Sequence, residues 1–122
     1  MSGKDRLLAV TPTEGGGHLV SLSPSKILDE LEINRIGRDL KDLISNGARN
    51  LIIDFSSVDH LSSSALGMLI TIRDQLNSVK GSLKLCSIRP EIYQIFKITS
   101  LDRLFSIYPT ATQALEDLTG KP

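Results

Sequence analysis

Apolar residues in this chain follow two patterns: short continuous runs and longer series at helical spacing. Short runs bounded by polar residues, glycine or proline are typical of strands. At Leu51–Ile53 three consecutive apolar residues predict a central strand that is buried on both faces. The predicted strands cover Arg6–Val10, His18–Leu22, Leu51–Phe55, Leu83–Ser87 and Leu104–Ile107.

Apolar residues three and four positions apart predict helices between these strands. The first series runs from Ile33 to Ile44, with Gly47 as the expected C-cap. Thr110 and Gln113 stand at the spacing of a capping box, which predicts the start of the last helix. The predicted helices cover about residues 33–44, 63–79, 90–98 and 110–118.

Two strands followed by alternating helices and strands predict the fold class. We expect one α/β domain with a mixed sheet of about five strands and about four helices, mainly on one face. A length of 122 residues suits a single domain spanning 1–122. Its ends, about 1–5 and 119–122, are expected to fray. Gly15–Gly17 is interpreted as a hairpin turn, because no Gly-Lys-Ser/Thr ending of a phosphate-binding loop follows it.

Composition narrows the functional classes. Fourteen basic and fourteen acidic residues cancel, so no basic excess points to nucleic acid. The single cysteine, Cys86, lies in a strand-like run and is expected to be a buried thiol in a reducing compartment. The start of the chain lacks a secretory signal, and no apolar run is long enough for a membrane span. We therefore expect a cytoplasmic protein with no direct membrane insertion.

Three consecutive serines, Ser62–Ser64, precede the apolar series that begins at Ala65. Serine is favoured at helix N-termini, where its oxygen accepts a hydrogen bond from an unpaired backbone N–H. A phosphate is also electrostatically favoured there. Two interpretations are open at this point: the serines only cap a helix, or they form a regulatory site.

An enzyme is a third hypothesis, because Asp54, Asp59 and His60 lie close to the serines in the sequence. A hydrolytic Ser/His/Asp set would use these groups. The serines do not stand in the Gly-x-Ser-x-Gly elbow that exposes such a nucleophile, and neither histidine has a second metal ligand at a suitable spacing. We therefore expect no enzymatic activity, no metal and no cofactor.

The segment DFSSVDHLSSSALGML resembles the signature of STAS domains, the fold of bacterial anti-sigma factor antagonists. In that pattern a strand ends in Asp-Leu-Ser, and Asp-Ser-Ser/Thr-Gly-Leu-Gly opens a helix. Here Ser62 stands in place of the aspartate and Ala65 in place of the first glycine. The C-terminal segment ITSLDRLFSIYPTATQALEDL also resembles the family's ending, with Ser100 in place of a glycine. The resemblance covers nearly the whole chain.

The resemblance implies a regulatory binding module that works by partner switching. The position of the phosphorylated serine in anti-sigma factor antagonists corresponds to Ser63, with Ser64 as the second choice. The implied partner is an anti-sigma factor that is also a serine kinase, and a weak homodimer is a further option. The alternative is a non-phosphorylated STAS module that serves a lipid- or anion-transport system. The expected partner-binding residues are Asp54, Ser56, His60, Ser62, Ser63, Ser64 and Arg73.

Overall fold

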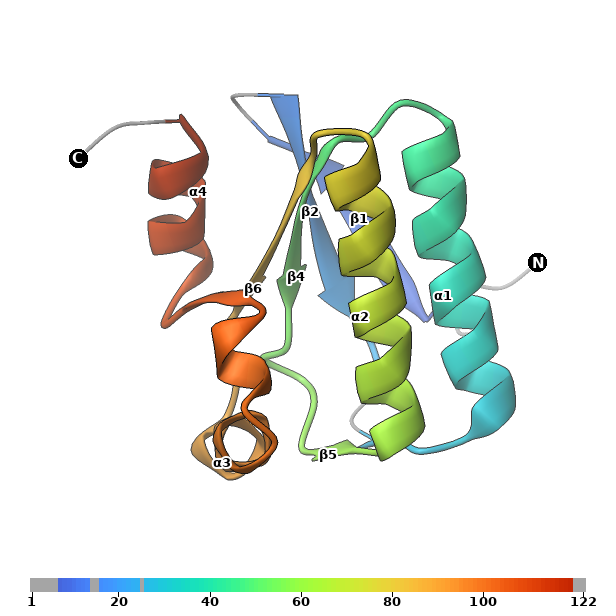
Figure 1. Cartoon of the computed structure of the whole chain (residues 1–122), viewed down its shortest axis with the longest axis vertical. Helices are drawn as coiled ribbons and strands as arrows, with labels where there is room; N and C mark the ends of the chain where they lie inside the picture. The colour runs from blue at the N-terminus through green and yellow to red at the C-terminus, as the bar shows by residue number, and fades with distance from the viewer. Residues whose placement is uncertain (1–6, 14–15, 25, 120–122) are drawn as a thin grey trace.

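Five strands form a mixed sheet at the centre of the computed structural model, which describes residues 7–13, 16–24 and 26–119 (Figure 1). The order across the sheet is β1-β2-β4-β6-β7. Only the β1–β2 pair is antiparallel; the other neighbours are parallel. The bounds are β1 Leu8–Pro12, β2 Gly17–Leu22, β4 Asn50–Asp54, β6 Ser82–Cys86 and β7 Ser106–Tyr108. This arrangement confirms the predicted fold class.

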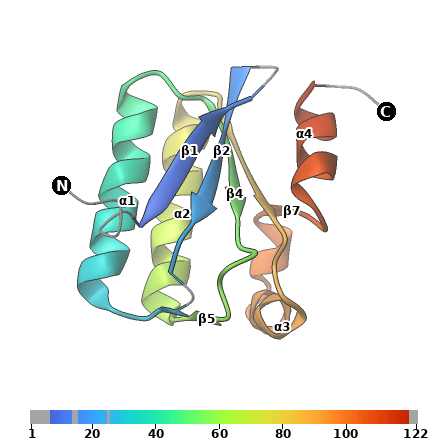
Figure 2. The same cartoon turned by 180° about the vertical axis from the view of Figure 1, so that it is seen from behind.

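Helices cover the sheet unequally, as Figures 1 and 2 show from opposite sides. Helices α1 and α2 lie side by side on one face and begin at the same end of the molecule. Helix α3 lies near that end, where β4 and β6 finish, whereas α4 packs against the other face. The bounds are α1 Glu30–Ser45, α2 Ser63–Ser78, α3 Pro90–Ile98 and α4 Ala111–Thr119, with a 3₁₀ turn, η3, at Leu101–Arg103.

The central strand β4 is buried on both faces, as its apolar run predicts. Ile53 belongs to the large core that includes Ile36 and Leu69 from α1 and α2. Ile52 points the other way, into a smaller core with Cys86 and Ala114. None of these six residues is more than 1 % exposed. Both cores therefore depend on β4, and its end fixes where the following loop leaves the sheet.

The last predicted strand begins two residues later than expected. Leu104 is not in a strand; it follows η3, and its N–H bonds to the Leu101 carbonyl. Ser100 before the turn adopts a left-handed conformation with φ 63°. The chain reverses direction through this turn, and Leu104, which the apolar run had assigned to the strand, caps it. Pairing with β6 therefore starts at Ser106.

Two glycines have steric reasons for their positions. Gly47, the expected C-cap, lies one residue past the cap Asn46 and has φ +107°, which favours glycine. At Gly81 a Cβ atom would lie 2.1 Å from the carbonyl oxygen of Arg49. A side chain at Gly81 would thus collide with the segment entering β4. Some predictions concern residues that the structure does not describe: fraying at 1–5 and 120–122, Arg6 as the start of the first strand, and Gly15 in the turn. Thr119, also expected to fray, is the last residue of α4.

A two-stranded ribbon that the sequence analysis missed supports the start of α2. Strands β3 (Lys26–Ile27) and β5 (His60–Leu61) are two residues long and pair in parallel. The Ser62 N–H then bonds to the Ile27 carbonyl at 3.1 Å. The ribbon thereby joins the chain before α1 to the chain before α2. No helix in the described part of the chain is long and apolar enough to cross a membrane.

Candidate functional site

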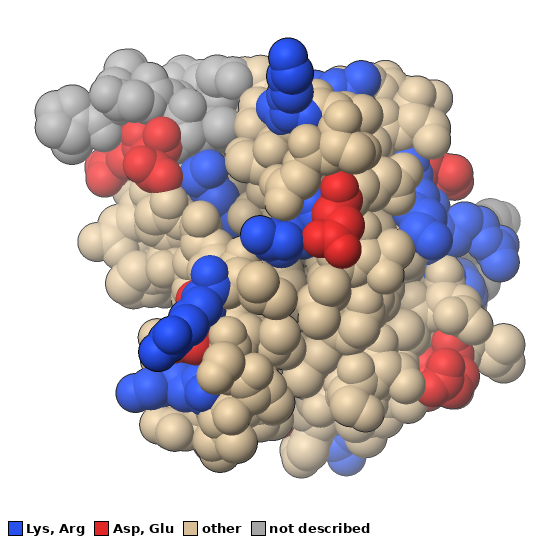
Figure 3. Space-filling model, viewed as in Figure 1, with Lys and Arg blue, Asp and Glu red and all other residues tan. Residues whose placement is uncertain are grey.

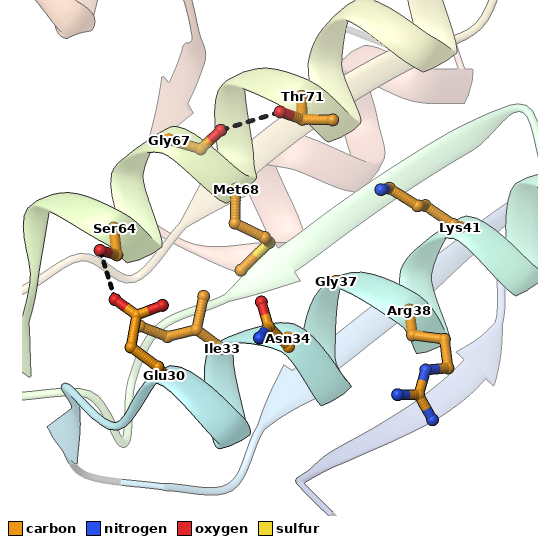
Figure 4. Close-up of a pocket in the computed structure, with 10 residues that line it drawn as sticks. All are labelled: Glu30, Ile33, Asn34, Gly37, Arg38, Lys41, Ser64, Gly67, Met68 and Thr71. Atoms are coloured by element: carbon orange, nitrogen blue, oxygen red, sulfur yellow. Dashed lines mark hydrogen bonds between the residues drawn. The ribbon is translucent and has the colours of Figure 1, made fainter.

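The three serines at the start of α2 have three different environments. Ser62 is the N-cap, and its Oγ accepts a hydrogen bond from the Ala65 N–H at 3.2 Å. Ser64 Oγ donates to Glu30 Oε2 at 2.7 Å, which links the first turns of α2 and α1 (Figure 4). Ser63 is exposed, and its hydroxyl has no hydrogen-bond partner among the residues that the structure describes. Capping therefore accounts for only one of the three.

The residues after the serines fix the orientation of this row. Ala65 and Leu66 are buried in the large core, so α2 is anchored from its first turn. The methyl group of Ala65 points into that core and does not line the surface around Ser63. Anchoring on the buried side leaves Ser63 and Ser64 on the outer side of the helix.

The loop between β4 and β5 is held by short local bonds. Asp54 ends β4, and its Oδ1 accepts from the Ser56 N–H at 2.7 Å. The Ser56 carbonyl lies 3.4 Å from Nη2 of Arg89, the residue that precedes α3. Buried Phe55 and Val58 anchor the loop from below. The loop thus presents Ser56 beside the end of β4 with a guanidinium next to it.

Asp59 and His60 form an exposed pair on this loop, with 2.8 Å between Oδ1 and Nδ1. The hydrogen bond from His60 lowers the pKa of Asp59, and charge from His60, Arg89 and Lys26 lowers it further. A carboxyl whose pKa is lower in the folded state stabilises the fold above its unfolded pKa, and this contribution is lost as pH falls through the folded value. Since the pair is exposed, the contribution is small. The imidazole bonds to its neighbour and not to a serine.

Arg73 lies apart from the other predicted partner-binding residues. It is ten residues beyond Ser63, which places it roughly 15 Å further along α2. Its Nε donates to the Leu104 carbonyl at 2.7 Å, and its Nη1 lies 3.1 Å from Asp74 Oδ1. The structure therefore gathers Asp54, Ser56, His60 and Ser62–Ser64 at one end of the molecule, while Arg73 secures the turn before β7.

Several surface residues of this end were not found from the sequence. Leu28 and Leu31 lie on either side of Glu30 and are 50 % and 73 % exposed, so they add apolar surface at this end of the molecule. Figure 3 shows few charged side chains over the first turns of α2, so hydroxyl and apolar groups dominate there. Two leucines on either side of Glu30, at the start of a helix, could have indicated this apolar surface from the sequence. The sequence held no such signal for Arg89, because only the fold brings this residue to the loop that follows Asp54.

A groove of about 600 Å³ runs between α1 and α2 from this end (Figure 4). Glu30 and Ser64 lie at its start, and Lys41 and Thr71 lie further along. Met68 extends into the space between the helices. No group of three or more potential metal ligands occurs within the described ranges. The described residues of the site thus provide a free hydroxyl, hydrogen-bonding groups and exposed apolar surface.

Comparison with known proteins identifies the family. The model of the STAS domain matches residues 11–114. The chain therefore belongs to the STAS domain family. A protein of Thermotoga neapolitana, named as a candidate anti-sigma factor antagonist, is 30% identical over 80 residues, covering 66% of this chain and 71% of the relative. The resemblance deduced from the Ser62–Ser64 and C-terminal segments is thereby confirmed.

Solved structures share the fold. A candidate anti-sigma factor antagonist from Thermotoga maritima superimposes with a TM-score of 0.80 at 23% identity, covering 91% of this chain and 93% of the other. The Bacillus cell fate determinant SpoIIAA, solved in its phosphorylated form, gives 0.70 at 18% identity, covering 91% and 98%. At these identities the likeness shows the fold alone. Together with the family match and the Thermotoga neapolitana relative, it describes the chain as an anti-sigma factor antagonist-like STAS domain.

Proposed function

We propose that the chain is a partner-switching regulator controlled by phosphorylation of Ser63. In its unmodified form it binds an anti-sigma factor that is also a serine kinase, through the end of the molecule that carries Ser62–Ser64, His60 and the Asp54–Ser56 loop. The kinase releases itself by transferring phosphate to Ser63. The chain supplies the acceptor hydroxyl and the binding surface, and performs no catalytic step of its own.

The observation that carries the proposal is the free hydroxyl of Ser63 at the first position of a 16-residue helix. Backbone N–H groups and the helix dipole favour a phosphate there, so the fold can remain unchanged. Ser64 is the weaker candidate, because its hydroxyl already binds Glu30. A phosphate on Ser64 would put about two negative charges against that carboxylate. Glu30 therefore favours modification at Ser63.

Release follows from the charge that phosphate adds. A phosphoserine carries about −1.5 to −2 charge at neutral pH. A partner seated over exposed Leu28 and Leu31 would exclude water from this end of the molecule. Burying the phosphate without a matching cation costs several kcal/mol, which lowers affinity by orders of magnitude. That SpoIIAA, of similar fold, has been solved in phosphorylated and unphosphorylated forms supports a switch that spares the fold.

Mass spectrometry after incubation with the anti-sigma serine kinase encoded in the same genome, and ATP, tests the site of modification. We expect one phosphate, on Ser63, and none on the Ser63→Ala variant. The Ser64→Ala variant is the matched control and should still be modified. Phosphate on Ser64 alone would move the acceptor by one residue and contradict the role given to Glu30.

The alternative is a non-phosphorylated module that serves a transport system, in line with Ser62 at the family's aspartate position. Under that function the kinase leaves every serine unmodified, and Ser63→Asp binds its partner as tightly as the parent. Either result would contradict a switch controlled by phosphorylation of Ser63, and the two together would favour the alternative. The cytoplasmic location expected for both functions remains a prediction.

A further inference from the structure

The groove between α1 and α2 has an ordered charge pattern. Glu30 lies where the groove begins, and Lys41 extends over it from three turns further along α1 (Figure 4). Eleven residues of helix separate them by roughly 16 Å. Arg38 is a second cation in the same half. The groove is therefore acidic at one end and basic at the other.

Beside Met68, the α2 side of the groove carries no side chain at its middle, because residue 67 is a glycine. Gly67 lies in the interior of α2, where glycine is less favourable than alanine. A Cβ atom at Gly67 would meet nothing within 4 Å, and the residue has no positive φ. Neither packing nor backbone conformation within the chain therefore requires glycine here. The surface of α2 between Ser64 and Thr71 is therefore accessible to close approach by another polypeptide.

An acidic end and a basic end on either side of the bare Gly67 position form a self-complementary surface. In a two-fold dimer each residue i meets j of the other copy while j meets i. With the axis near the middle of the groove, Glu30 of each copy faces Lys41 of the other, and Gly67 lies close to the axis. We propose that a second copy of this chain docks in the α1–α2 groove in this way.

The charge balance of the chain agrees with such a dimer. Fourteen basic and fourteen acidic residues give no net charge, so two copies do not repel each other at long range. The contact is confined to one groove, so the dimer belongs to the small, weak class of interfaces. Because Ser64 and Glu30 line one end of the groove, the dimer would cover the edge of the surface around Ser63. The dimer does not require phosphorylation of Ser63.

Sedimentation equilibrium up to about millimolar concentration tests the proposal with the protein alone. The parent should self-associate. The Glu30→Lys and Lys41→Glu variants each bring like charges together twice across the axis, and each should dimerise at least roughly tenfold more weakly. An equimolar mixture of the two variants should regain the parental affinity, because both contacts in the mixed dimer are again attractive.

Two further variants separate groove filling from loss of folding. Gly67→Gln places a helix-favouring side chain into the middle of the groove, so it should melt no lower than the parent yet dimerise less. Lys97→Glu, an exposed charge reversal on α3, is the control and should leave the dimer intact. A monomeric parent at the highest concentration would overturn the proposal. So would a dimer that Gly67→Gln or the charge reversals leave unchanged, or a mixture that remains monomeric.

Discussion

Ser100 occupies a backbone position that costs stability. Its φ of 63° is in the left-handed region, where a side chain costs roughly 1–2 kcal/mol and glycine does not. The family pattern has glycine at this point. We expect Ser100→Gly to raise the free energy of unfolding by about 1 kcal/mol, after allowing for the greater freedom of glycine in the unfolded chain.

Thermal melts followed by circular dichroism measure this effect as a rise of a few degrees. Ser45→Gly is the matched control, because Ser45 is in the helical conformation of α1. It should not raise the melting temperature. Equal behaviour of the two variants would contradict the left-handed assignment of Ser100.

Arg73 is a second residue whose role depends on the fold. Its bond to the Leu104 carbonyl joins α2 to a turn 31 residues later in the chain. Arg73→Glu would place a carboxylate against that carbonyl, so we expect a loss of about 1–3 kcal/mol in urea unfolding. His60→Ala removes an exposed side chain and should change stability by less than about 0.5 kcal/mol. If Arg73→Glu left the free energy of unfolding unchanged, the bond to Leu104 would contribute nothing to stability, and the arginine would act in partner binding alone.

The serine row illustrates what the sequence could predict at this scale. Helix propensity and the following apolar series placed three hydroxyls at a helix start, and the structure confirms that helix. The difference between Ser63 and Ser64 could not be predicted, because it depends on Glu30, 34 residues away. Local patterns specify local conformation, whereas a contact between distant side chains follows only from the packing of α1 against α2.

Among the elements, strand β4 holds the two cores together. Ile53 is fully buried against α1 and α2, and Ile52 lies on the opposite face. Ile53→Asp would bury a charge with no partner, at a cost of several kcal/mol. We expect this variant to lack a cooperative melt. Thr11→Asp on edge strand β1 is exposed and should melt close to the parent. Parental stability of Ile53→Asp would refute the burial of β4.

Helix α4 should loosen at high pH. Burial raises the pKa of the Cys86 thiol to about 11, and burial with the hydrogen bond to Asp117 raises that of Tyr108 to about 12. The two are neighbours in β6 and β7 under α4. Both pKa values are higher in the folded state, so stability is intact below about pH 9 and falls as pH rises through the folded values.

Melting temperatures measured from pH 8 to 12 test this expectation. We expect a decline that begins near pH 9, and a shallower one for Tyr108→Phe, which keeps the ring and lacks the titrating hydroxyl. A melting temperature that stays constant to pH 12 would contradict the raised pKa values of both groups.

The elements themselves were largely predictable, for a physical reason. Strands and helices of five residues or more bury enough side chains to impose a period of two or of 3.6 on the sequence. The β3–β5 ribbon has two residues per strand and can impose none. The final strand was placed two residues early, because the apolar side chain of Leu104 does not reveal the reversal at Ser100.

For the whole molecule, the position of the site explains how a switch can leave the fold intact. The serine row, the β4–β5 loop and the β3–β5 ribbon lie at one end of the sheet, where Ile27, Phe55 and Val58 anchor them to the large core and Ser63 stays exposed. A charge added at Ser63 therefore meets solvent in the free protein and a buried surface only in a complex. Under the proposed switch the fold serves as a support, and phosphorylation of Ser63 would act on partner binding alone.

The most direct test of this account is a calorimetric titration of the anti-sigma serine kinase with the parent, Ser63→Ala and Ser63→Asp. The free energies of unfolding of all three should agree within about 1 kcal/mol, because Ser62 and not Ser63 caps α2. Ser63→Ala should bind as the parent does, and Ser63→Asp, with about one of the two phosphate charges, at least roughly tenfold more weakly. Equal affinities of Ser63→Ala and Ser63→Asp, in folded proteins, would contradict the switch.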